Sequence, residues 1–196
     1  RNLLNGQTVK TKTVTEELKN RLGETQVAVA DSCGGFKAMP RMAADVLRLF
    51  KGCENVIMMP ANRGLRFFAP LFLTYNKFYR RRIHYIVIGG WLDTFLESHK
   101  WLVRLLKKFD AIYVESATMK AALCERAFDN AVVMHNFKKL NSLSENELEY
   151  PDDEPYKLCT FSRVMKEKGI EDAIDAVKTV NSRLGRTVYT LDIFGQ

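Results

Sequence analysis

The sequence predicts an α/β fold built on a Rossmann-like parallel sheet. Two observations support this prediction: short apolar stretches recur along the chain, and amphipathic helical patterns separate them. Continuous apolar strands that alternate with helices are typical of a parallel sheet covered on both faces. Because 46% of the residues are hydrophobic and 27% are charged, as in ordinary globular proteins, we expect a packed core.

The first helix begins near the start of the chain. Val14, Leu18 and Leu22 recur every four residues and predict a helix that ends at Gly23. Gly6 stands before this helix with no strand ahead of it, so we expect the chain to begin just after a missing first strand. We then expect a buried strand at 25–31, further strands at 55–59, 83–88, 111–115 and 131–134, and helices at 40–50, 63–82, 101–108 and 116–128.

The composition changes between residues 138 and 154, where Asn, Ser, Glu, Asp and Pro dominate. Such a stretch is typical of an exposed linker between domains. We therefore expect an N-terminal Rossmann-like domain at 1–140, a linker at 141–155 and the start of a second Rossmann-like domain at 156–196.

The second domain repeats the alternation of strand and helix. It is predicted as a buried strand at 158–162, a helix that follows Gly169 and ends at Gly185, and a strand at 188–194. One strand-helix-strand unit cannot bury both faces of a sheet, so we expect this domain to be cut short.

Arg163 and Lys168 are the strongest candidates for ligand binding. They lie in a basic loop, 163–169, between a predicted strand and a helix whose first turn is acidic. Backbone N–H groups at a helix start attract anions, and an Arg and a Lys at the same place can hold two phosphates. The pattern fits a diphosphate, and the alternative is an ordinary strand-to-helix turn with solvated charges.

Glycine-rich turns follow two predicted strands of the first domain. One is Ser32–Gly35, and the other contains Gly89 and Gly90, with Asp93 close behind. The carboxyl ends of parallel strands are where ligands bind, and glycines let a ligand approach the backbone. The alternatives are a plain turn at 32–35 and, for Asp93, the N-cap of the next helix.

Residues 63–82 combine many aromatic side chains with three final arginines, Arg80, Arg81 and Arg82. One interpretation is an interfacial helix that places aromatic side chains among lipid headgroups. The other, which we favour, is a helix that covers the sheet and ends in cations suited to a helix C-terminus.

The charge and the cysteines narrow the choice of partners. A net charge of +7 favours anionic partners, and no recognised nucleic-acid motif accompanies the basic residues, so we expect no nucleic acid. The four cysteines have no paired spacing, which predicts reduced, mostly buried thiols with neither disulfides nor a metal site. We expect a cytoplasmic protein, with a position at the inner face of the cell membrane as the alternative.

The order of these parts resembles that of a glycosyltransferase with the GT-B fold, and in particular the retaining enzymes of family 4 that build bacterial surface polysaccharides. The residues that carry the resemblance are 5–12, 83–92 and 135–137 and, above all, Phe161–Arg163 with Lys168–Gly169, which match that family's donor motif. Here Gly and Trp stand where many relatives have a His at the end of the strand 83–88.

The resemblance implies transfer of a sugar from a nucleoside diphosphate sugar to a lipid-linked or saccharide acceptor, with retention and without another cofactor. Arg163 and Lys168 would hold the diphosphate of the donor. Gly6, Gln7, Gly89, Gly90 and Asp93 would line the acceptor side. The family's pair of glutamates would lie beyond residue 196, so we expect little or no activity from this chain alone, and we assign no catalytic residue.

Two other functions remain open from the sequence. A non-enzymatic module that binds nucleotides or phosphate could share this architecture, because a fold does not fix a function. A nucleotide-sugar epimerase of the GT-B fold is the second alternative. An epimerase needs acid and base groups, for which the sequence offers chiefly Asp93 and Glu115.

Overall fold

The structure is a computed structural model that describes residues 6–30, 38–138, 142–148 and 152–195. The chain divides into two compact units, Arg1–Lys139 and Leu140–Gln196. In the described residues of both units, all paired strands are parallel and helices connect them. The predicted α/β class with a Rossmann-like parallel sheet is therefore confirmed.

Among the described residues of the first unit, four strands form one sheet. They are β1 (Asn55–Met58), β2 (Arg82–Ile86), β3 (Ala111–Val114) and β4 (Ala131–Val133), which lie side by side in chain order. In the register, Tyr85 of β2 lies beside Met58 of β1 and Ile112 of β3. Crossovers between parallel strands are almost always right-handed, so with this strand order we expect the connecting helices on one face of the sheet.

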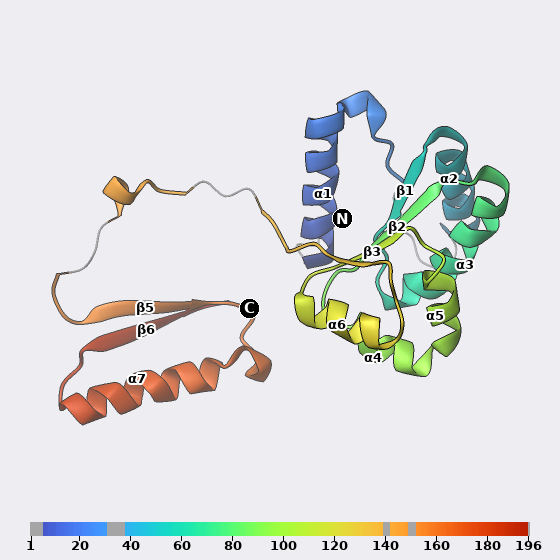
Figure 1. Cartoon of the computed structure of the whole chain (residues 1–196). Coiled ribbons are helices and arrows are strands. Elements are labelled where there is room, and N and C mark those ends of the chain that lie inside the picture. The colour runs from blue at the N-terminus through green and yellow to red at the C-terminus, as the bar shows by residue number, and fades with distance from the viewer. Residues whose placement is uncertain (1–5, 31–37, 139–141, 149–151, 196) are drawn as a thin grey trace. The chain divides into compact units, whose positions relative to one another are not determined.

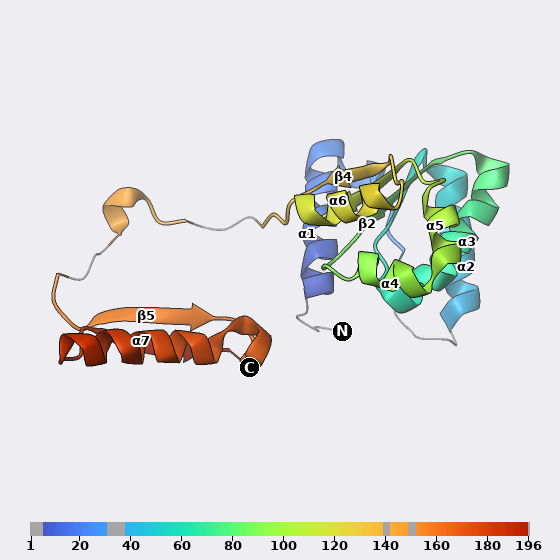
Figure 2. The same ribbon diagram turned by 60° about the horizontal axis from the view of Figure 1, so that its bottom comes forward.

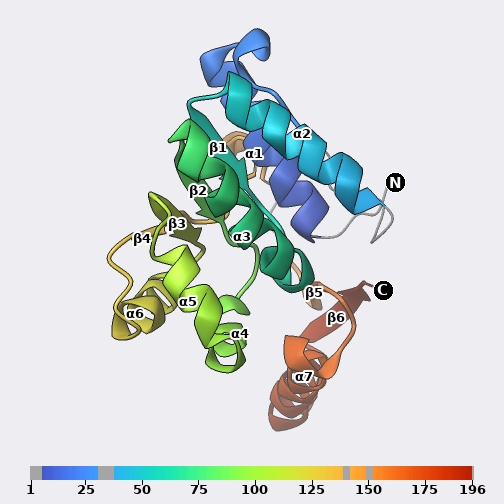
Figure 3. The same ribbon diagram turned by 90° about the vertical axis from the view of Figure 1, so that its right-hand side faces the viewer.

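In the described part of the first unit, the helices that accompany this sheet are α1 (Gly6–Leu22), α2 (Met39–Gly52), α3 (Asn62–Tyr79), α4 (Leu92–Ser98), α5 (Lys100–Leu106) and α6 (Ala117–Glu125). In Figure 1 the strands run between α1 on one side and α2, α3 and α5 on the other. Figure 2 shows α6 beside β4, and Figure 3 shows α2 and α3 packed along each other. The predicted helices are thus present, with α4 as an additional short helix before α5.

The core of the first unit lies between the sheet and α2, α3 and α5. Alternate residues of the strands point into it and are almost fully buried, as expected for period-two side chains. The Phe50 ring of α2 meets the Phe72 ring of α3 edge to face, with 5.2 Å between the ring centres. The central buried side chains are Phe50, Val56, Met58, Leu65, Phe72, Ile83, Tyr85, Leu96, Leu102, Leu106 and Ile112.

The opposite face of the sheet is less well covered. His84 and Tyr113 remain half-buried on this face, and Val132 is 43% exposed. In the described part of α1, the side chains that become buried are Lys10 and Val14. The expectation of a sheet covered on both faces therefore holds fully for one face only.

Helix α3 contains most of the aromatic stretch 63–82. Leu65, Phe68 and Phe72 are buried against the sheet, whereas Phe78 near the end of the helix is 77% exposed. Just past the helix, Arg81 folds back, and its Nε donates to the backbone oxygen of Phe50 at 2.9 Å. The helix covers the sheet, as the favoured interpretation predicted.

The buried strand predicted at 25–31 is wrong for the residues that the structure describes. Residues Glu24–Gln26 form a 3₁₀ turn, and 27–30 pair with no described strand. Val27 has extended backbone angles, yet Val29 is 62% exposed. A run of Val and Ala favours extended backbone, but a strand also needs a neighbour for its hydrogen bonds, and no described strand reaches this segment.

The second unit contains β5 (Tyr156–Phe161), α7 (Ile170–Leu184) and β6 (Tyr189–Phe194). The two strands pair in parallel, with Tyr156 beside Tyr189 and Phe161 beside Phe194. Short 3₁₀ turns precede β5 at Glu145–Glu147 and precede α7 at Lys166–Lys168. Helix α7 ends at Gly185, whose φ of 65° is the left-handed conformation typical of a glycine C-cap.

The strand at 158–162 was predicted to be buried, and this is wrong. Leu158 is 41% exposed and Phe161 is 89% exposed. In the described part of the second unit, Ile170 and Val188 are the apolar side chains that count as buried. The physical reason is coverage, because a single helix can shield only one face of a two-stranded sheet.

The predicted burial of the cysteines is also wrong for the described residues. Cys124 and Cys159 are exposed and Cys53 is half-buried, although all three are free thiols. The spacing of cysteines along the chain carries no information about their burial.

Candidate functional site

A cavity of about 470 Å³ opens at the carboxyl ends of β2, β3 and β4 in the first unit. Ile88 and Gly89 follow β2, Glu115 follows β3, and Asn136 lies shortly after β4. Parallel strands present these ends at one edge of the sheet, which is the usual place for a ligand in α/β proteins. The lining residues are Val9, Lys10, Ile88, Gly89, Glu115, Asn136, Phe137 and Lys138.

An ion pair between Lys10 and Glu115 lies in this cavity. Lys10 Nζ is 2.7 Å from Glu115 Oε1, and it also donates to the backbone oxygen of Val87 at 3.3 Å. The Lys10 side chain is only 8% exposed, and a buried ammonium group requires such partners. The pair therefore fixes α1 against the ends of β2 and β3.

The carboxylate of Glu115 is held in its ionised form. Burial by itself would raise its pKa, but hydrogen bonds from Lys10, from the backbone N–H of Gly89 and from the side chain of Asn136, with the charge of Lys10, outweigh burial. The pKa of Glu115 is therefore lower than its ordinary value. Three segments therefore meet near this carboxylate: helix α1 with Lys10, the turn after β2 with Gly89, and the segment after β4 with Asn136.

The turn after β2 requires glycine at position 89. Gly89 has φ of 84°, and a Cβ there would lie 3.6 Å from Trp91 Cδ1. Trp91 closes the turn, since its Nε1 donates to the backbone oxygen of Ile88 at 2.8 Å. The backbone at this point is left-handed, and only glycine adopts that conformation without strain.

The predicted acceptor-side residues are distributed over different places. Gly89 lines the cavity, whereas Gly90 is exposed in the same turn and is not among the lining residues. Gly6 and Gln7 begin α1, the helix that carries Lys10 into the cavity. The predicted loop at 32–35 lies outside the described residues.

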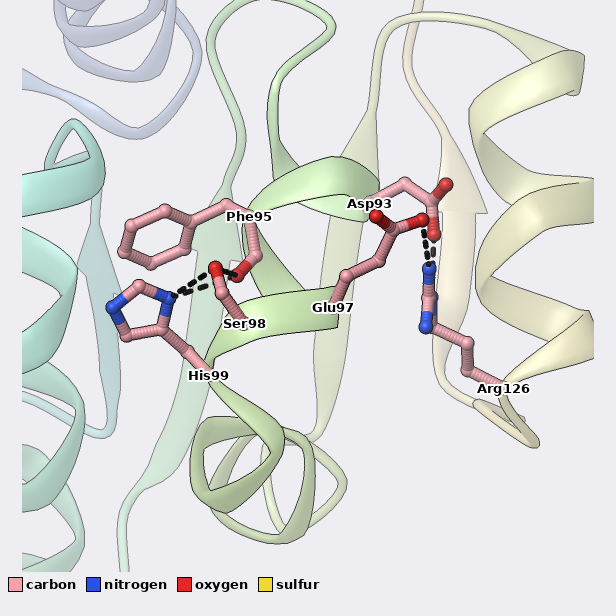
Figure 4. A network of polar contacts seen from close by, with 6 residues as sticks. All are labelled: Asp93, Phe95, Glu97, Ser98, His99 and Arg126. Carbon is pink, nitrogen blue, oxygen red and sulfur yellow. Dashed lines mark hydrogen bonds and ion pairs between the residues drawn. The ribbon is translucent and has the colours of Figure 1, made fainter.

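Asp93 belongs to a different network, which Figure 4 shows. Its Oδ1 accepts a hydrogen bond from Arg126 Nε at 2.5 Å, and Glu97 accepts one from Arg126 Nη2 at 3.3 Å. Arg126 thereby ties the end of α6 to α4. Trp91, not Asp93, is the N-cap residue of α4, and Asp93 lies in its first turn.

The same figure shows how α4 passes into α5. The His99 ring stacks on Phe95 with 4.0 Å between the ring centres, and its Nδ1 lies 2.9 Å from the backbone oxygen of Phe95. Ser98 Oγ is 3.1 Å from the same nitrogen. At the C-terminal end of α4, the His99 ring is a hydrogen-bond partner for the backbone oxygen of Phe95 and for the Ser98 hydroxyl. This network therefore has a structural role.

Sequence reasoning did not find the ion pair. In the sequence, Glu115 stands out only as an acid or base for an epimerase, and Lys10 only as part of the stretch 5–12. The available signal was a lysine four positions before Val14, on the face of α1 that points inward.

In the second unit, Arg163 and Lys168 lie in the loop between β5 and α7. Both side chains are exposed, and neither makes an ion pair or a side-chain hydrogen bond with another described residue. Gly169, with φ of 67°, precedes α7, and no side chain caps the first N–H groups of this helix. The end of β6 comes close to the same loop, because a Cβ at Gly195 would collide with the backbone oxygen of Ser162.

The described residues bring together no group of three or more His, Cys, Asp or Glu side chains that could hold a metal ion. Among the described helices, none has the length and apolar character to cross a membrane. Comparison of the chain with models of protein families gives no match, and searches of the curated proteins and of the solved structures give none either.

Proposed function

We propose that this chain is part of a retaining glycosyltransferase of the GT-B fold that uses a nucleoside diphosphate sugar. The observation that carries the proposal is the pair of exposed cations Arg163 and Lys168 beside the uncapped start of α7. Two cations and free backbone N–H groups at one helix start suit the two phosphates of such a donor. The resemblance of the stretch from Phe161 to Gly169 to the donor motif of family 4 points the same way.

The chemistry of this site is stabilisation of a leaving group. When the bond between the anomeric carbon and the phosphate oxygen breaks, negative charge develops on the departing diphosphate, and Arg163 and Lys168 would neutralise it. The acceptor hydroxyl forms the new bond to the same carbon, and its proton leaves with the diphosphate. Because two cations do this work, the proposal needs no divalent ion.

The cavity in the first unit is the proposed acceptor side. It lies at the carboxyl edge of a parallel sheet, where Gly89 and the Lys10–Glu115 pair meet. The two candidate carboxylates are both engaged, Glu115 with Lys10 and Asp93 with Arg126. Asp93 is not among the residues that line the cavity, so the described lining offers Glu115 without a second carboxylate to act as its acid or base partner, which favours transfer over epimerisation.

Membrane contact through 63–82 has weaker support. Most large apolar side chains of α3 pack on the core, and Phe78 is the large apolar side chain of this helix that is exposed. The proposal therefore includes both a lipid-linked and a free saccharide acceptor.

The test uses inorganic pyrophosphate, which probes the loop without assuming a nucleotide base or sugar. In calorimetric titration, we expect the Arg163→Ala, Lys168→Ala double variant to bind pyrophosphate at least about tenfold more weakly than the parent, because it loses two charge-assisted contacts. Lys178→Ala, which removes a lysine within α7 and outside the loop, is the matched control and should bind as the parent does. Equal binding by the parent and the double variant would overturn the proposal.

A further inference from the structure

The outer faces of α3 and α5 carry cations without carboxylates. The sequence has no Asp or Glu between Glu54 and Asp93, the stretch that contains α3, and none between Glu97 and Asp110, the stretch that contains α5. The two helices pack against each other on the side of the sheet away from α1 (Figure 1). The exposed cations near their ends, which we call the basic surface, are Lys77, Arg80, Arg104, Lys107 and Lys108.

The strand order brings these cations together. Helix α3 ends just before β2 and helix α5 just before β3, and β2 and β3 are neighbouring parallel strands, with His84 beside Ala111. Parallel strands begin at the same edge of a sheet, so the two helix ends lie near each other. In the described part of the chain, none of the cations of the basic surface pairs with a carboxylate.

The carboxylates at this edge of the sheet lie off the two helices. Asp110 precedes β3, and its Oδ2 accepts a hydrogen bond from the backbone N–H of Ile83 at 2.7 Å. Glu54 and Asp129 precede β1 and β4, the first and last strands of the described sheet. The basic surface therefore keeps a positive potential that attracts anionic partners.

Two large apolar rings are exposed on the same helices. Phe78 in the last turn of α3 is 77% exposed, and Trp101 in the first turn of α5 is 46% exposed. Trp101, Arg104 and Lys108 follow one another at helical spacing along one side of α5. Exposed aromatic rings among Lys and Arg are typical of surfaces that lie on a membrane, where the rings enter the headgroup region and the cations meet lipid phosphates.

We propose that the basic surface docks on an anionic lipid bilayer. Lys77, Arg104 and Lys108 contact the lipid phosphates, and Phe78 and Trp101 enter the headgroup region. Charge complementarity selects this partner, because each Lys or Arg near an anionic bilayer adds to the attraction. Duplex DNA would also meet the cations, but it offers the two rings no apolar environment.

This contact differs from burial of the aromatic face of α3 in lipid. Leu65, Phe68 and Phe72 on that face pack on the core and take no part. The contact is also independent of the proposed function, because the diphosphate loop belongs to the second unit.

The experiment is co-sedimentation of the chain with vesicles of phosphatidylcholine alone and of phosphatidylcholine mixed with phosphatidylglycerol. We expect binding to the mixed vesicles and at least about tenfold weaker binding to the neutral ones. Added salt should release the protein, because it screens the attraction between exposed charges. Equal binding to both kinds of vesicle, or binding to neither, would overturn the proposal.

A triple variant tests the basic surface itself. Lys77→Gln, Arg104→Gln and Lys108→Gln change exposed side chains, so the chain should still fold, which an unchanged urea midpoint verifies. Each lost cation should weaken binding to the mixed vesicles about fivefold, so the triple variant should bind about a hundredfold more weakly.

The matched control removes the same charge from α1, on the other side of the sheet. Lys12→Gln, Lys19→Gln and Arg21→Gln change cations that pair with glutamates, and this variant should bind nearly as the parent does. An equal loss in the two triple variants would mean that net charge alone sets the binding, and the proposal would fail.

Trp101 reports whether this surface faces the lipid. Its emission should move to shorter wavelength when mixed vesicles are added, and Trp101→Phe should lose most of this shift while it still sediments with the vesicles. Trp91, the other tryptophan of the sequence, is half-buried and donates to the backbone oxygen of Ile88, so it should contribute little. Sedimentation of the parent without any change in emission would contradict the proposed orientation.

A short DNA duplex separates the two kinds of anionic partner. If the duplex binds through the same three cations and the mixed vesicles do not bind, the surface belongs to nucleic acid and the proposal is wrong. Binding to the mixed vesicles that the triple variant loses supports the proposal whatever the pyrophosphate titration gives, because the two tests change residues of different units.

Discussion

The two units of the chain share one motif, a strand, a helix and a parallel strand, yet they differ in how well they bury it. In the first unit Phe50 and Leu102 have no exposed surface. In the second unit Leu158, Ile174 and Leu184 are each 41 to 52% exposed. Since both units have apolar strands and amphipathic helices, the difference lies in how many helices cover each sheet. Burial is therefore a property of the whole assembly of elements and not of the strand sequence.

The charged groups follow the same division. In the first unit Lys10 is buried and paired with Glu115, whereas in the second unit Arg163 and Lys168 are exposed and make no side-chain pair with a described residue. A paired buried charge holds the structure together, and an unpaired exposed one is available to a ligand.

The largest effect is expected from truncating the core of the first unit. Leu102→Ala should lower the free energy of unfolding by about 3 to 4 kcal/mol, because it leaves a cavity at a fully buried site. Ile174→Ala in the second unit should cost less than about 1 kcal/mol at its 45% exposed position. The sequence has two tryptophans, Trp91 and Trp101, both in the first unit, so urea unfolding followed by fluorescence reports that unit.

Hydrogen exchange of the amides in β6 measures the unfolding of the second unit. If Leu102→Ala and Ile174→Ala lower the free energy of unfolding of their own units by similar amounts, the difference in burial does not set the stability of the two units.

The next largest effect should come from breaking the buried ion pair. Glu115→Gln leaves Lys10 buried without a counter-charge, and we expect a loss of about 3 kcal/mol at neutral pH. Lys168→Ala should change stability by less than about 0.5 kcal/mol, since its side chain is exposed. Fluorescence-detected urea unfolding measures the first variant and hydrogen exchange of β6 the second.

The same pair gives a dependence on pH with a defined sign. The pKa of Glu115 is lowered in the folded protein, because its hydrogen bonds and the charge of Lys10 outweigh burial. The unfolded chain therefore binds more protons than the folded chain below about pH 4.5, and the contribution of Glu115 to stability is lost as the pH falls through its folded pKa. Glu115→Gln should lack this part of the acid-induced loss. A variant that keeps the full acid dependence would show that other carboxylates cause it.

Each unit also contains an asparagine that joins a helix or loop to a strand, and these allow a closer comparison. Asn181 of α7 accepts from the backbone N–H groups of Val188 and Tyr189 at 2.9 and 3.0 Å and donates to the oxygen of Tyr189 at 2.8 Å. Asn130 donates to the oxygens of Leu106 and Phe109 at 3.1 and 2.7 Å. Each side chain provides hydrogen-bond partners for backbone N–H or C=O groups.

We expect Asn130→Ala and Asn181→Ala to cost about 1 to 2 kcal/mol each, because backbone groups lose their partners. The Asn181 change should increase hydrogen exchange throughout β6, since few buried side chains hold this strand. The Asn130 change should affect exchange only near its own loop, because the core holds β4 in place. If faster exchange is confined in both variants to the amides next to the substituted residue, the strands of the two units are equally stable.

Much of the fold could be predicted because four strands of the first unit are short apolar runs bounded by helical patterns. The prediction failed where the outcome depends on distant neighbours. The stretch 25–31 has the composition of a strand but no described partner, and the strand at 158–162 has the composition of a core strand but one covering helix. Local sequence carries the preference for a conformation, and the partner decides whether it is realised.

The candidate site follows the same rule. Gly89 could be predicted from the sequence, since a glycine after a strand marks a turn at the edge of a sheet. The ion pair joins residues 105 positions apart, and no local pattern connects them. Arg163 and Lys168 could be identified because both lie within one loop, so their proximity depends on the local chain alone.

The smallest effect concerns His84 on the less covered face of the first sheet. Burial lowers its pKa, the nearby charge of Asp110 raises it in part, and Arg82 lowers it again. Its Nε2 lies 3.2 Å from Asn55 Oδ1, and its Nδ1 is buried without a partner among the described residues. The ring is therefore favoured in its neutral form.

Because the folded protein binds this proton less readily than the unfolded chain, stability should fall as the pH drops below about 6.5 and level off once the folded pKa is passed. His84→Gln keeps a polar group for Asn55 without a titrating ring, and it should flatten the stability profile between pH 6.5 and 5 without changing the acid-induced loss that Glu115 causes. Fluorescence-detected urea midpoints across this range measure the difference. A profile as steep as that of the parent would mean that His84 is protonated in the folded protein at little cost. The less covered face of the sheet would then be more accessible to water than the burial of His84 indicates.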